Sequence, residues 1–311
     1  MEINDEMLSR AAGCLAGEFC GDAYGAQYEF ETNGEKVSRL IDESRGGMNA
    51  SEVWHTPAGQ ITDDSEMAIA LAESIISEHG YSAKTALKNY ISWKDTKPHD
   101  IGGTVKDALD SCAKERNPDS ESNGSLMRVA PLGVYCAASG ADAVKLGAED
   151  AAITHIKEVC LEANSAYTNA IAYAVRNGGT PEEICGVMLK STGNKKILET
   201  IKAGVDKMPG MEMREHIGHV ILALQIAVYQ LMHAKDTREA IIEASRIGGD
   251  TDTNAAIAGA LVGAVRGFDS LPAEWIKTVQ ECDTTKGRHP RELYQNKIRD
   301  IKALARDLLT A

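Results

Sequence analysis

The amino-acid sequence predicts an all-α fold, arranged as one compact multi-helix domain over residues 1–311. Apolar residues recur at spacings of three and four along nearly the whole chain, as they do on the buried face of amphipathic helices. Convincing period-two alternation, the pattern of a half-buried strand, is absent. No long Pro- or Ser-rich linker and no repeat of solenoid length divides the chain, which favours a single domain.

The predicted helices follow one another from end to end. Residues 8–19 place their apolar side chains on one face, and residues 298–308 do the same near the end. Residues 31–60 and 281–292 are the least regular parts of the chain. Between the first and last helices, apolar spacing predicts helices over residues 64–79, 83–94, 102–114, 141–152, 157–176, 181–190, 195–206, 214–233, 236–246 and 253–267.

Two of these helices have recognisable starts. Thr180 stands before Pro181, with Glu183 in the first turn, and Asp236 stands before the run TREAIIEA. Thr and Asp are favoured as N-cap residues, and Pro suits the first helical position because its missing N–H has no partner there. We therefore expect helices to begin at both places.

Net charge and cysteine content narrow the function classes. The formal net charge of -13 argues against a basic surface that binds nucleic acid or anionic membranes. The seven cysteines include no CxxC pair, so we expect buried free thiols in a reducing compartment. The acidic N-terminus lacks the features of a secretion signal, and the apolar run at residues 217–232 reads as a core helix, being short for a membrane span. These observations predict a cytoplasmic protein without a membrane segment.

The stretch ITDDSEMAIA, residues 61–70, has two interpretations. Asp63 with Glu66 three residues later forms a capping-box-like helix start. That interpretation leaves the run Thr62, Asp63 and Asp64 unexplained. At the turn into a helix these oxygen donors can converge on one hard cation, such as Mg²⁺ or Mn²⁺.

The stretch GGDTDTN at residues 248–254 also carries more oxygen donors than a helix start needs. A calcium loop of the EF-hand type counted from Asp250 would require Gly and Glu where Ala255 and Leu261 stand. A phosphatase of the haloacid dehalogenase class requires a hydrophobic strand before the acidic run, whereas the preceding TREAIIEASRIGG is helical. Both interpretations are weak.

A third interpretation of the same stretch is a turn between two helices. Gly248 and Gly249 would end one helix, and Asp250, Asp252 and Thr253 would direct oxygens at a metal. The run of alanines and glycines that follows lets the next helix pack closely. We prefer this interpretation.

Five carboxylates in one cleft would repel one another and lose hydration, so they would need compensating cations. The set comprises Glu29, from the stretch GDAYGAQYEF, with Asp63, Asp64, Asp250 and Asp252. Two divalent cations, Mg²⁺ or Mn²⁺, would resolve the conflict, and such a pair can orient sugar hydroxyls and activate a water. The hypothesis is a metal cleft formed by helix-entrance loops.

A different polar stretch, NGSLMR, follows the loop at residues 114–125. Asn123, Gly124 and Ser125 can expose backbone N–H groups at a helix entrance, which suits a phosphate or diphosphate. The alternative is an ordinary Asn-Gly turn.

Taken in order, the stretches GDAYGAQYE, TDDSEMA, DIGGT, NGSLMR, THIKEV and RIGGDTDTNAAIAGALVGA resemble the ADP-ribosylglycohydrolase family, which includes the enzyme that reactivates dinitrogenase reductase. The resemblance covers roughly residues 8–270. It implies an all-α fold with a binuclear magnesium or manganese centre. It also implies hydrolysis of the bond from C1 of ADP-ribose to a protein side chain or a small acceptor.

The resemblance also implies residue roles. Glu29 matches an acidic position beside the metals, and either Glu29 or Asp64 would transfer the proton. Asn123, Gly124 and Ser125 would contact the diphosphate, with His155 near the distal part of ADP-ribose. The implied metal ligands are Thr62, Asp63, Asp64, Asp250, Asp252 and Thr253.

Asp100, in HDIGGT, is the best indication of the acceptor. Arginine-directed relatives carry an acidic residue before a comparable Ile-Gly stretch, and a carboxylate pairs well with a guanidinium. The alternative is an N-cap for a helix that begins near Ile101. Two departures from the family pattern remove no implied metal ligand. Ser65 stands where Thr is usual, and Ile156 and Lys157 follow Thr154 and His155 where relatives often have another His or Pro-His.

The function we infer from these residues and from the resemblance is hydrolysis of an ADP-ribosyl link to arginine or another guanidino group. The partner would be an ADP-ribosylated protein or small molecule, with no membrane or nucleic acid involved, and we expect a monomer. One alternative is the same fold acting on serine-linked ADP-ribose, O-acetyl-ADP-ribose or another acceptor. A second, from a different class, is a non-catalytic ADP-ribose-binding homologue.

Overall fold

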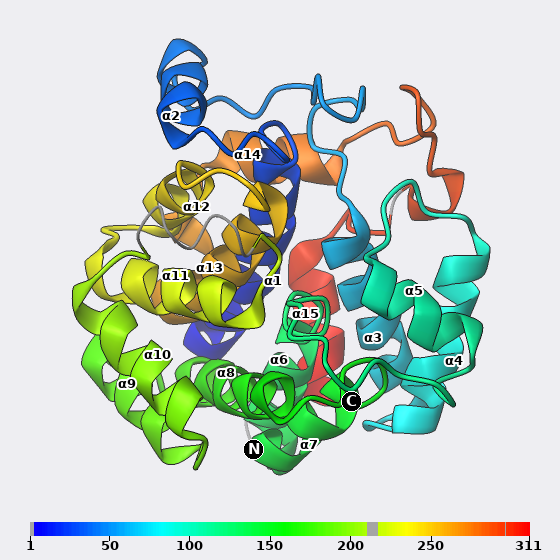
Figure 1. The fold of residues 1–311 in the computed structure, drawn as a ribbon, viewed down its shortest axis with the longest axis vertical. Coiled ribbons are helices and arrows are strands. Elements are labelled where there is room, and N and C mark those ends of the chain that lie inside the picture. The colour runs from blue at the N-terminus through cyan, green and yellow to red at the C-terminus, as the bar shows by residue number, and fades with distance from the viewer. Residues whose placement is uncertain (1–2, 210–216, 296) are drawn as a thin grey trace.

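The computed structural model describes residues 3–209, 217–295 and 297–311, which form helices and connecting turns (Figure 1). The extended pairings in this part of the chain are two isolated β-bridges, between Ser51 and Thr56 and between Ser122 and His219. The described residues hold no β-strand. The all-α class predicted from the sequence is therefore confirmed.

The helices span nearly the whole described chain. Two short 3-10 helices are η2 (Phe268–Ser270) and η3 (Glu292–Tyr294). The α-helices are α1 (Asp5–Gly25), α2 (Gly34–Glu43), α3 (Asp63–Glu78), α4 (Ala83–Asp95), α5 (Gly103–Asp110), α6 (Ala130–Ser139), α7 (Ala143–Ala151), α8 (Glu158–Asn177), α9 (Pro181–Lys190), α10 (Lys195–Asp206), α11 (Val220–His233), α12 (Thr237–Ser245), α13 (Thr251–Arg266), α14 (Ala273–Gln280) and α15 (Ile301–Thr310).

The sequence prediction misses three helices, α2, α6 and α14. Because α2 lies within residues 31–60, the irregular character predicted for that whole segment is wrong. Its buried residues Val37 and Ile41 stand four apart, which is helical spacing, so the local signal for α2 is present in the sequence. Helix α6 is buried on most of its surface, so its apolar residues do not alternate with polar ones at a helical period.

Both predicted helix starts are present. Thr180 and Glu183 form a complete capping box at the start of α9, with Pro181 in the first turn. The Asp236 side chain accepts a hydrogen bond from the backbone N–H of Glu239 at the start of α12. These local signals depend only on neighbouring residues, which is why the sequence suffices to find them.

Helix α11 starts later than predicted. It begins at Val220 because Gly218 has a φ of 75° and His219 pairs with Ser122 in a β-bridge; residues 214–216 lie outside the described residues. Most of α11 is buried, as expected for a core helix. None of the helices in the described ranges combines the length and the apolar character that crossing a membrane requires.

The cysteines are free thiols, as predicted, and six of them are buried. Cys112 is exposed, so the prediction of burial is wrong for this residue. It follows the end of α5, where the chain turns at the surface with a φ of 54°.

A seam of small residues joins α1 to α13 in the middle of the molecule (Figure 1). A Cβ atom added to Gly17 would lie 2.0 Å from the carbonyl oxygen of Gly259, so the two backbones are in direct contact. The two helices run antiparallel, which places Asp22 of α1 near Asp252 at the start of α13. The residues of α1 in the seam are Gly13, Gly17, Gly21 and Gly25, which face Gly263, Gly259, Ala255 and Thr251 of α13.

A buried ion pair ties the C-terminal segment to α3. The Arg291 guanidinium donates to both carboxylate oxygens of Glu66 at 2.6 Å, and to the carbonyl and hydroxyl oxygens of Thr96 at 3.2 and 2.8 Å. The Trp93 indole N–H donates to the same Glu66 carboxylate at 2.7 Å. Arg291 and Glu66 side chains are 6% and 1% exposed. The pair therefore orients the helix whose first turn contributes to the site.

We expect Arg291→Met to destabilise the protein by about 3–5 kcal/mol, because it leaves the Glu66 carboxylate buried without its partner. The measurement is urea unfolding followed by circular dichroism. The control is Lys297→Met, which breaks an exposed pair with Glu73 and should change stability by less than about 1 kcal/mol. Equal effects of the two variants would contradict the prediction.

Candidate metal centre

The entrance to α3 is capped by a residue from another helix. Thr62 is the N-cap residue, but its side chain makes no capping bond to α3. Asp22 of α1 accepts hydrogen bonds from the backbone N–H of Thr62 at 3.0 Å, the backbone N–H of Ser65 at 3.1 Å and the Thr62 hydroxyl at 2.8 Å. Asp22 therefore accepts the hydrogen bonds at the start of α3, and the side chains of Asp63 and Asp64 are not needed to cap this helix.

The capping-box interpretation of Asp63 and Glu66 is wrong, because Glu66 is bonded to Arg291 rather than to the helix start. Asp63 and Asp64 are 6% and 0% exposed. Asp63 accepts a long hydrogen bond, 3.4 Å, from the backbone N–H of Gly102. The Oδ1 atom of Asp64 is buried without a hydrogen-bond partner among the described residues. An oxygen in that state calls for a cation or a proton.

The entrance to α13 is the predicted turn between two helices. Gly248 and Gly249 have φ values of 80° and 83°, a conformation that favours glycine. Asp250 occupies the N-cap position but makes no capping bond to α13; its Oδ2 accepts from the Asn123 side-chain amide at 2.6 Å. The Oδ1 atom of Asp252 accepts from the backbone N–H of Thr253 at 2.9 Å. The Asp250 side chain is thus directed away from the helix start, whereas Asp252 bonds one N–H of the first turn of α13.

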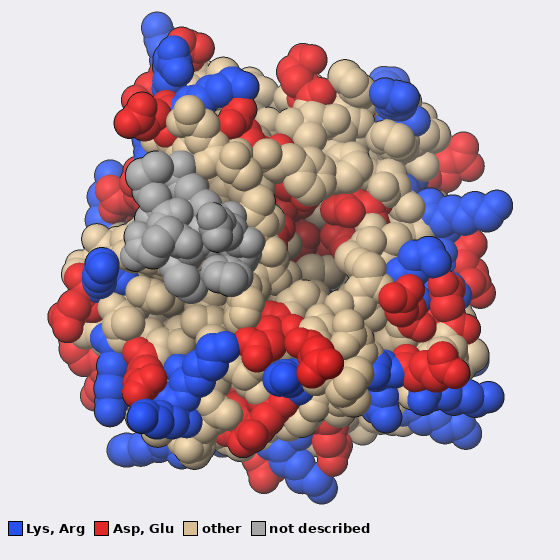
Figure 2. Space-filling view, in the orientation of Figure 1, with Lys and Arg blue, Asp and Glu red and all other residues tan. Residues whose placement is uncertain are grey.

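The tertiary structure brings the entrances of α3 and α13 close together. Their carboxylates, with others, form two groups that share Asp252. Oxygens of Asp22, Asp64 and Asp252 lie within 4.8 Å of one another, and so do oxygens of Glu29, Asp100 and Asp252. Figure 2 shows a hollow near the centre of this face with acidic side chains inside it. Figure 1 shows α13 and α3, whose entrances supply Asp252 and Asp64, on either side of this region.

Sequence reasoning missed Asp22. The residue lies in the stretch GDAYGAQYEF, from which only Glu29 is selected as a site residue. A signal was present, since Asp22, like Glu18 one turn before it, is a carboxylate among small and apolar residues of α1 and is fully buried. A charged residue in such a position must have a partner.

Burial and mutual repulsion raise the pKa values of the clustered carboxyls. Burial, reinforced by neighbouring carboxylates, holds the pKa values of Asp63, Asp64 and Asp252 well above their ordinary range. Burial raises the pKa of Asp22 to about 6, against the hydrogen bonds that it accepts. Ionising all these groups together therefore requires compensating positive charge.

Glu29 is fixed by an aromatic residue that sequence reasoning also missed. The Trp54 indole N–H donates to Glu29 Oε2 at 2.6 Å. Burial, followed by the charge of Asp100, raises the pKa of Glu29 to about 8. The N-cap interpretation of Asp100 is wrong, because α5 begins at Gly103 with Gly102 as its N-cap. Asp100 instead lies beside Glu29 and Asp252.

The loop with Asn123, Gly124 and Ser125 borders the same cleft through Asn123, which donates to Asp250. It does not form a helix entrance as predicted, since a turn follows and α6 begins only at Ala130. Ser125 is fully buried, and its hydroxyl accepts from the Asn164 amide at 3.0 Å. Among these three side chains, Asn123 is therefore the one in contact with the carboxylates.

His155 lies behind this loop. A Cβ atom on Gly124 would be 3.4 Å from His155 Cε1, and the histidine is completely buried. Its Nε2 is 2.7 Å from the Ser122 hydroxyl and its Nδ1 is 2.8 Å from the Thr154 hydroxyl. Burial lowers the pKa of His155 to about 3, so the ring is neutral and supports the loop.

The family can now be assigned from the whole chain. The family model described as ADP-ribosylglycohydrolase matches residues 3–311. The chain is a member of the ADP-ribosylglycohydrolase family. This ADP-ribosylglycohydrolase is thereby a hydrolase that acts on N-glycosidic bonds.

Relatives with assigned activities cover most of this ADP-ribosylglycohydrolase. It is 26% identical over 290 residues to ADP-ribosylarginine hydrolase Tri1 of Pseudomonas putida, covering 88% of this chain and 75% of that protein. It is 25% identical over 273 residues to the ADP-ribosyl-[dinitrogen reductase] glycohydrolase of Rhodospirillum rubrum, with coverages of 86% and 89%. A solved ADP-ribosylglycohydrolase-related protein complex has the same fold, with a TM-score of 0.76, 24% identity and coverages of 98% and 99%.

The residues in the cleft fit the metal dependence of the ADP-ribosylglycohydrolases. The two groups offer carboxylate oxygens, which are ligands that hard divalent cations prefer. The buried Asp64 oxygen without a partner and the raised pKa values of its neighbours indicate the same need for positive charge. The cleft of this ADP-ribosylglycohydrolase is therefore suited to bind metal.

Proposed function

We propose that this ADP-ribosylglycohydrolase releases ADP-ribose from arginine or another guanidino group, using two divalent cations, Mg²⁺ or Mn²⁺. The observation that carries the proposal is the pair of carboxylate groups that share Asp252. One group is deeply buried and suits cations, whereas the other contains the partly buried Asp100. The residues that would hold the cations are Thr62, Asp63, Asp64, Asp250, Asp252 and Thr253.

When bound, divalent cations would orient the sugar hydroxyls and activate a water. The remaining steps fall to residues of the chain. The Trp54 N–H occupies Glu29 Oε2, so Oε1 is the oxygen of Glu29 that exchanges a proton. Asp64 is the alternative proton carrier because its Oδ1 has no hydrogen-bond partner among the described residues.

Asp100 supports the assignment of a guanidino acceptor. Its carboxylate lies beside that of Glu29, and two neighbouring carboxylates favour a cationic, multiply donating group such as guanidinium. The Pseudomonas putida relative, named an ADP-ribosylarginine hydrolase, is consistent with this acceptor. Serine-linked ADP-ribose or O-acetyl-ADP-ribose would not use the charge of Asp100 in the same way.

The loop of Asn123, Gly124 and Ser125 is the proposed contact for the diphosphate. Asn123 joins that loop to the carboxylates through Asp250, and His155 stabilises the loop from behind. We expect the substrate to be an ADP-ribosylated protein or small molecule and the enzyme to act as a monomer. In this arrangement the ribose would lie between the loop and Glu29.

The decisive experiment compares arginine-linked and serine-linked ADP-ribosyl peptides. We expect ADP-ribose release from the arginine-linked peptide with Mg²⁺ or Mn²⁺, and loss of release with chelator. Preference for the serine-linked peptide would favour the alternative acceptor. Tight ADP-ribose binding without release from either peptide, with bound metal verified, would favour the non-catalytic alternative.

A further inference from the structure

Four aromatic rings gather beside the Glu29–Asp100 end of the cleft, with Trp54 at their centre. The Trp54 ring lies 5.6 Å from Phe30, 5.3 Å from His99 and 6.4 Å from His289, in each case edge to face. We call Phe30, Trp54, His99 and His289 the ring cluster. His99 directly precedes Asp100, so the ring cluster adjoins the carboxylates through two separate segments, at Trp54–Glu29 and at His99–Asp100.

Backbone and side-chain hydrogen bonds fix the position of the ring cluster. The Trp54 backbone N–H donates to the Ser51 hydroxyl at 3.1 Å, and the indole N–H donates to Glu29 at 2.6 Å. The Phe30 N–H donates to the carbonyl of Gly249 at 2.8 Å, in the turn that carries Asp250. The indole is thus held in a single orientation next to the cleft.

The position of the Phe30 side chain contributes little to the stability of the fold. Its side chain is 59% exposed, and its backbone has a φ of 63°, which is uncommon for a bulky residue. Ile217, which a Cβ atom added to Gly249 would meet at 3.3 Å, is 45% exposed. An exposed aromatic residue in a costly backbone conformation at the rim of a cleft indicates contact with a ligand or partner.

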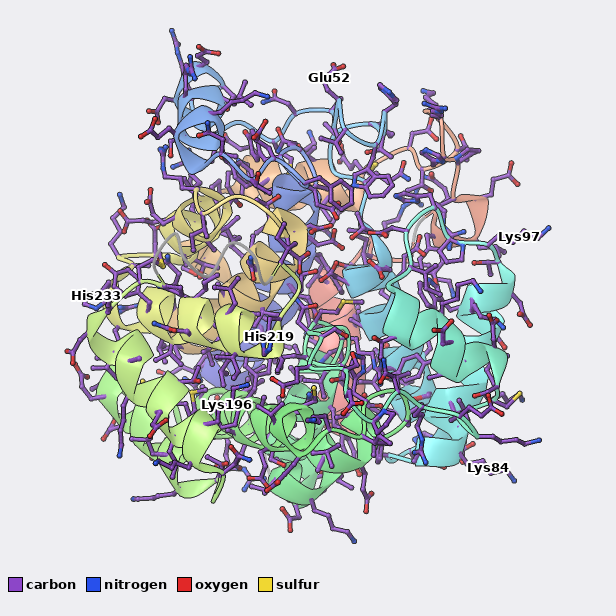
Figure 3. The ribbon with its side chains drawn as sticks, viewed as in Figure 1. Glu52, Lys84, Lys97, Lys196, His219 and His233 are labelled. Atoms are coloured by element: carbon purple, nitrogen blue, oxygen red, sulfur yellow. The ribbon has the colours of Figure 1, made fainter. Side chains whose placement is uncertain are left out.

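The ring cluster and the proposed diphosphate loop contact different carboxylates of the cleft. Asn123 contacts Asp250, whereas Trp54 contacts Glu29, and both carboxylates border the same site. In Figure 3, Glu52, on the same turn as Trp54, lies above the hollow of Figure 2, and His219, paired with Ser122, lies below it. With the diphosphate at the loop and the ribose beside Glu29, the group on C1 of the ribose would extend toward the ring cluster.

We propose that Trp54 and Phe30 form the acceptor subsite, in which the guanidinium of an ADP-ribosylated arginine packs against the indole and Phe30 contacts the polypeptide that carries this arginine. The inference rests on the proposed function and narrows its substrate class to arginine within a protein. Guanidinium groups stack on aromatic faces, where the ring quadrupole attracts the cation. Glu29 and Asp100 supply the opposing negative charge.

The test uses two variants of Trp54 that both lack the bond to Glu29 and differ in the ring. Trp54→Phe retains an aromatic face and Trp54→Leu does not. With ADP-ribosylarginine as substrate, we expect kcat/KM of Trp54→Leu to fall about tenfold below that of Trp54→Phe. Mn²⁺ affinity should be the same in both variants, since neither removes a proposed metal ligand.

Phe30→Ala tests the contact with the polypeptide. We expect KM to rise by about three- to tenfold for an ADP-ribosylated arginine peptide and to stay unchanged for free ADP-ribosylarginine, with kcat retained. Leu293→Ala is the matched control, because Leu293 is 63% exposed and lies outside the ring cluster. It should leave both substrates unaffected.

Equal kcat/KM values for Trp54→Leu and Trp54→Phe would overturn the stacking, and an identical effect of Phe30→Ala on both substrates would overturn the polypeptide contact. In those cases an active wild-type enzyme would leave the proposed function intact. A metal-loaded wild-type enzyme that releases no ADP-ribose from arginine would overturn the proposed function and this inference together.

Discussion

Replacing Asp252 by Asn lowers kcat/KM by about 1,000-fold or more, because Asp252 is a proposed cation ligand and belongs to both carboxylate groups of the cleft. The substitution keeps the size of the side chain and the acceptor oxygen for the Thr253 N–H. The measurement is ADP-ribose release from an arginine-linked peptide at saturating Mn²⁺. Unchanged activity and metal content would refute the assignment of Asp252.

The same variant has the opposite effect on the stability of the metal-free protein. Asp252 is 1% exposed and is repelled by Glu29 and Asp64, so removal of its charge relieves an unfavourable interaction. We expect the metal-free Tm to rise in Asp252→Asn and the Tm gain on adding Mn²⁺ to shrink, since binding to the folded state alone raises stability. Asp206→Asn, at an exposed position of α10, is the control and should behave like wild type in both measurements.

The second large effect is expected from Gly17→Ala, which should lower the free energy of unfolding by about 3 kcal/mol or more. The added Cβ would lie 2.0 Å from the backbone carbonyl oxygen of Gly259, and a backbone atom cannot rotate out of the way. Helices α1 and α13 must then separate, which moves Asp22 away from Asp252. We therefore expect a Tm lower by roughly 5 °C or more and weaker Mn²⁺ binding.

Gly186→Ala provides the matched control for that substitution. Gly186 lies within α9, and a Cβ atom there would meet nothing within 4 Å. Alanine is the better helix former, so this variant should be more stable than wild type by about 0.5–1 kcal/mol. Thermal unfolding of both variants decides the matter, and a Gly17→Ala protein as stable as wild type would contradict close packing of the seam.

Much of the helical structure is predictable from local patterns. The capping box at Thr180 and the glycine turn at Gly248 and Gly249 depend on residues that are neighbours in the chain. The sequence alone therefore predicts both features. Helix α6 is not predicted because it is buried on most sides, so its apolar residues do not alternate with polar ones at a helical period. Helix α2 is missed although its apolar residues Val37, Leu40 and Ile41 stand at helical spacing.

Other features depend on partners far away in the sequence. The residues of the TDDSE stretch suggest a self-contained capping box, yet Asp22 and Arg291 provide the partners of Thr62 and Glu66. Residues close in sequence do not distinguish a local capping box from bonds to distant residues. The choice is made only when the helices pack and bring Asp22 and Arg291 to the start of α3. The N-cap interpretation of Asp100 failed for the same reason.

The sequence by itself determined the all-α class, the family and the supply of oxygen donors at two helix entrances, because periodicity and motif order are properties of neighbouring residues. Only the tertiary structure decided that Asp22 belongs with Asp64 and Asp252, and that Trp54 holds Glu29 beside Asp100. The approach of Asp22 to Asp252 exists because the glycine seam allows α1 and α13 to pack backbone to backbone. The distances between residues that are far apart in the sequence are set only when the helices pack.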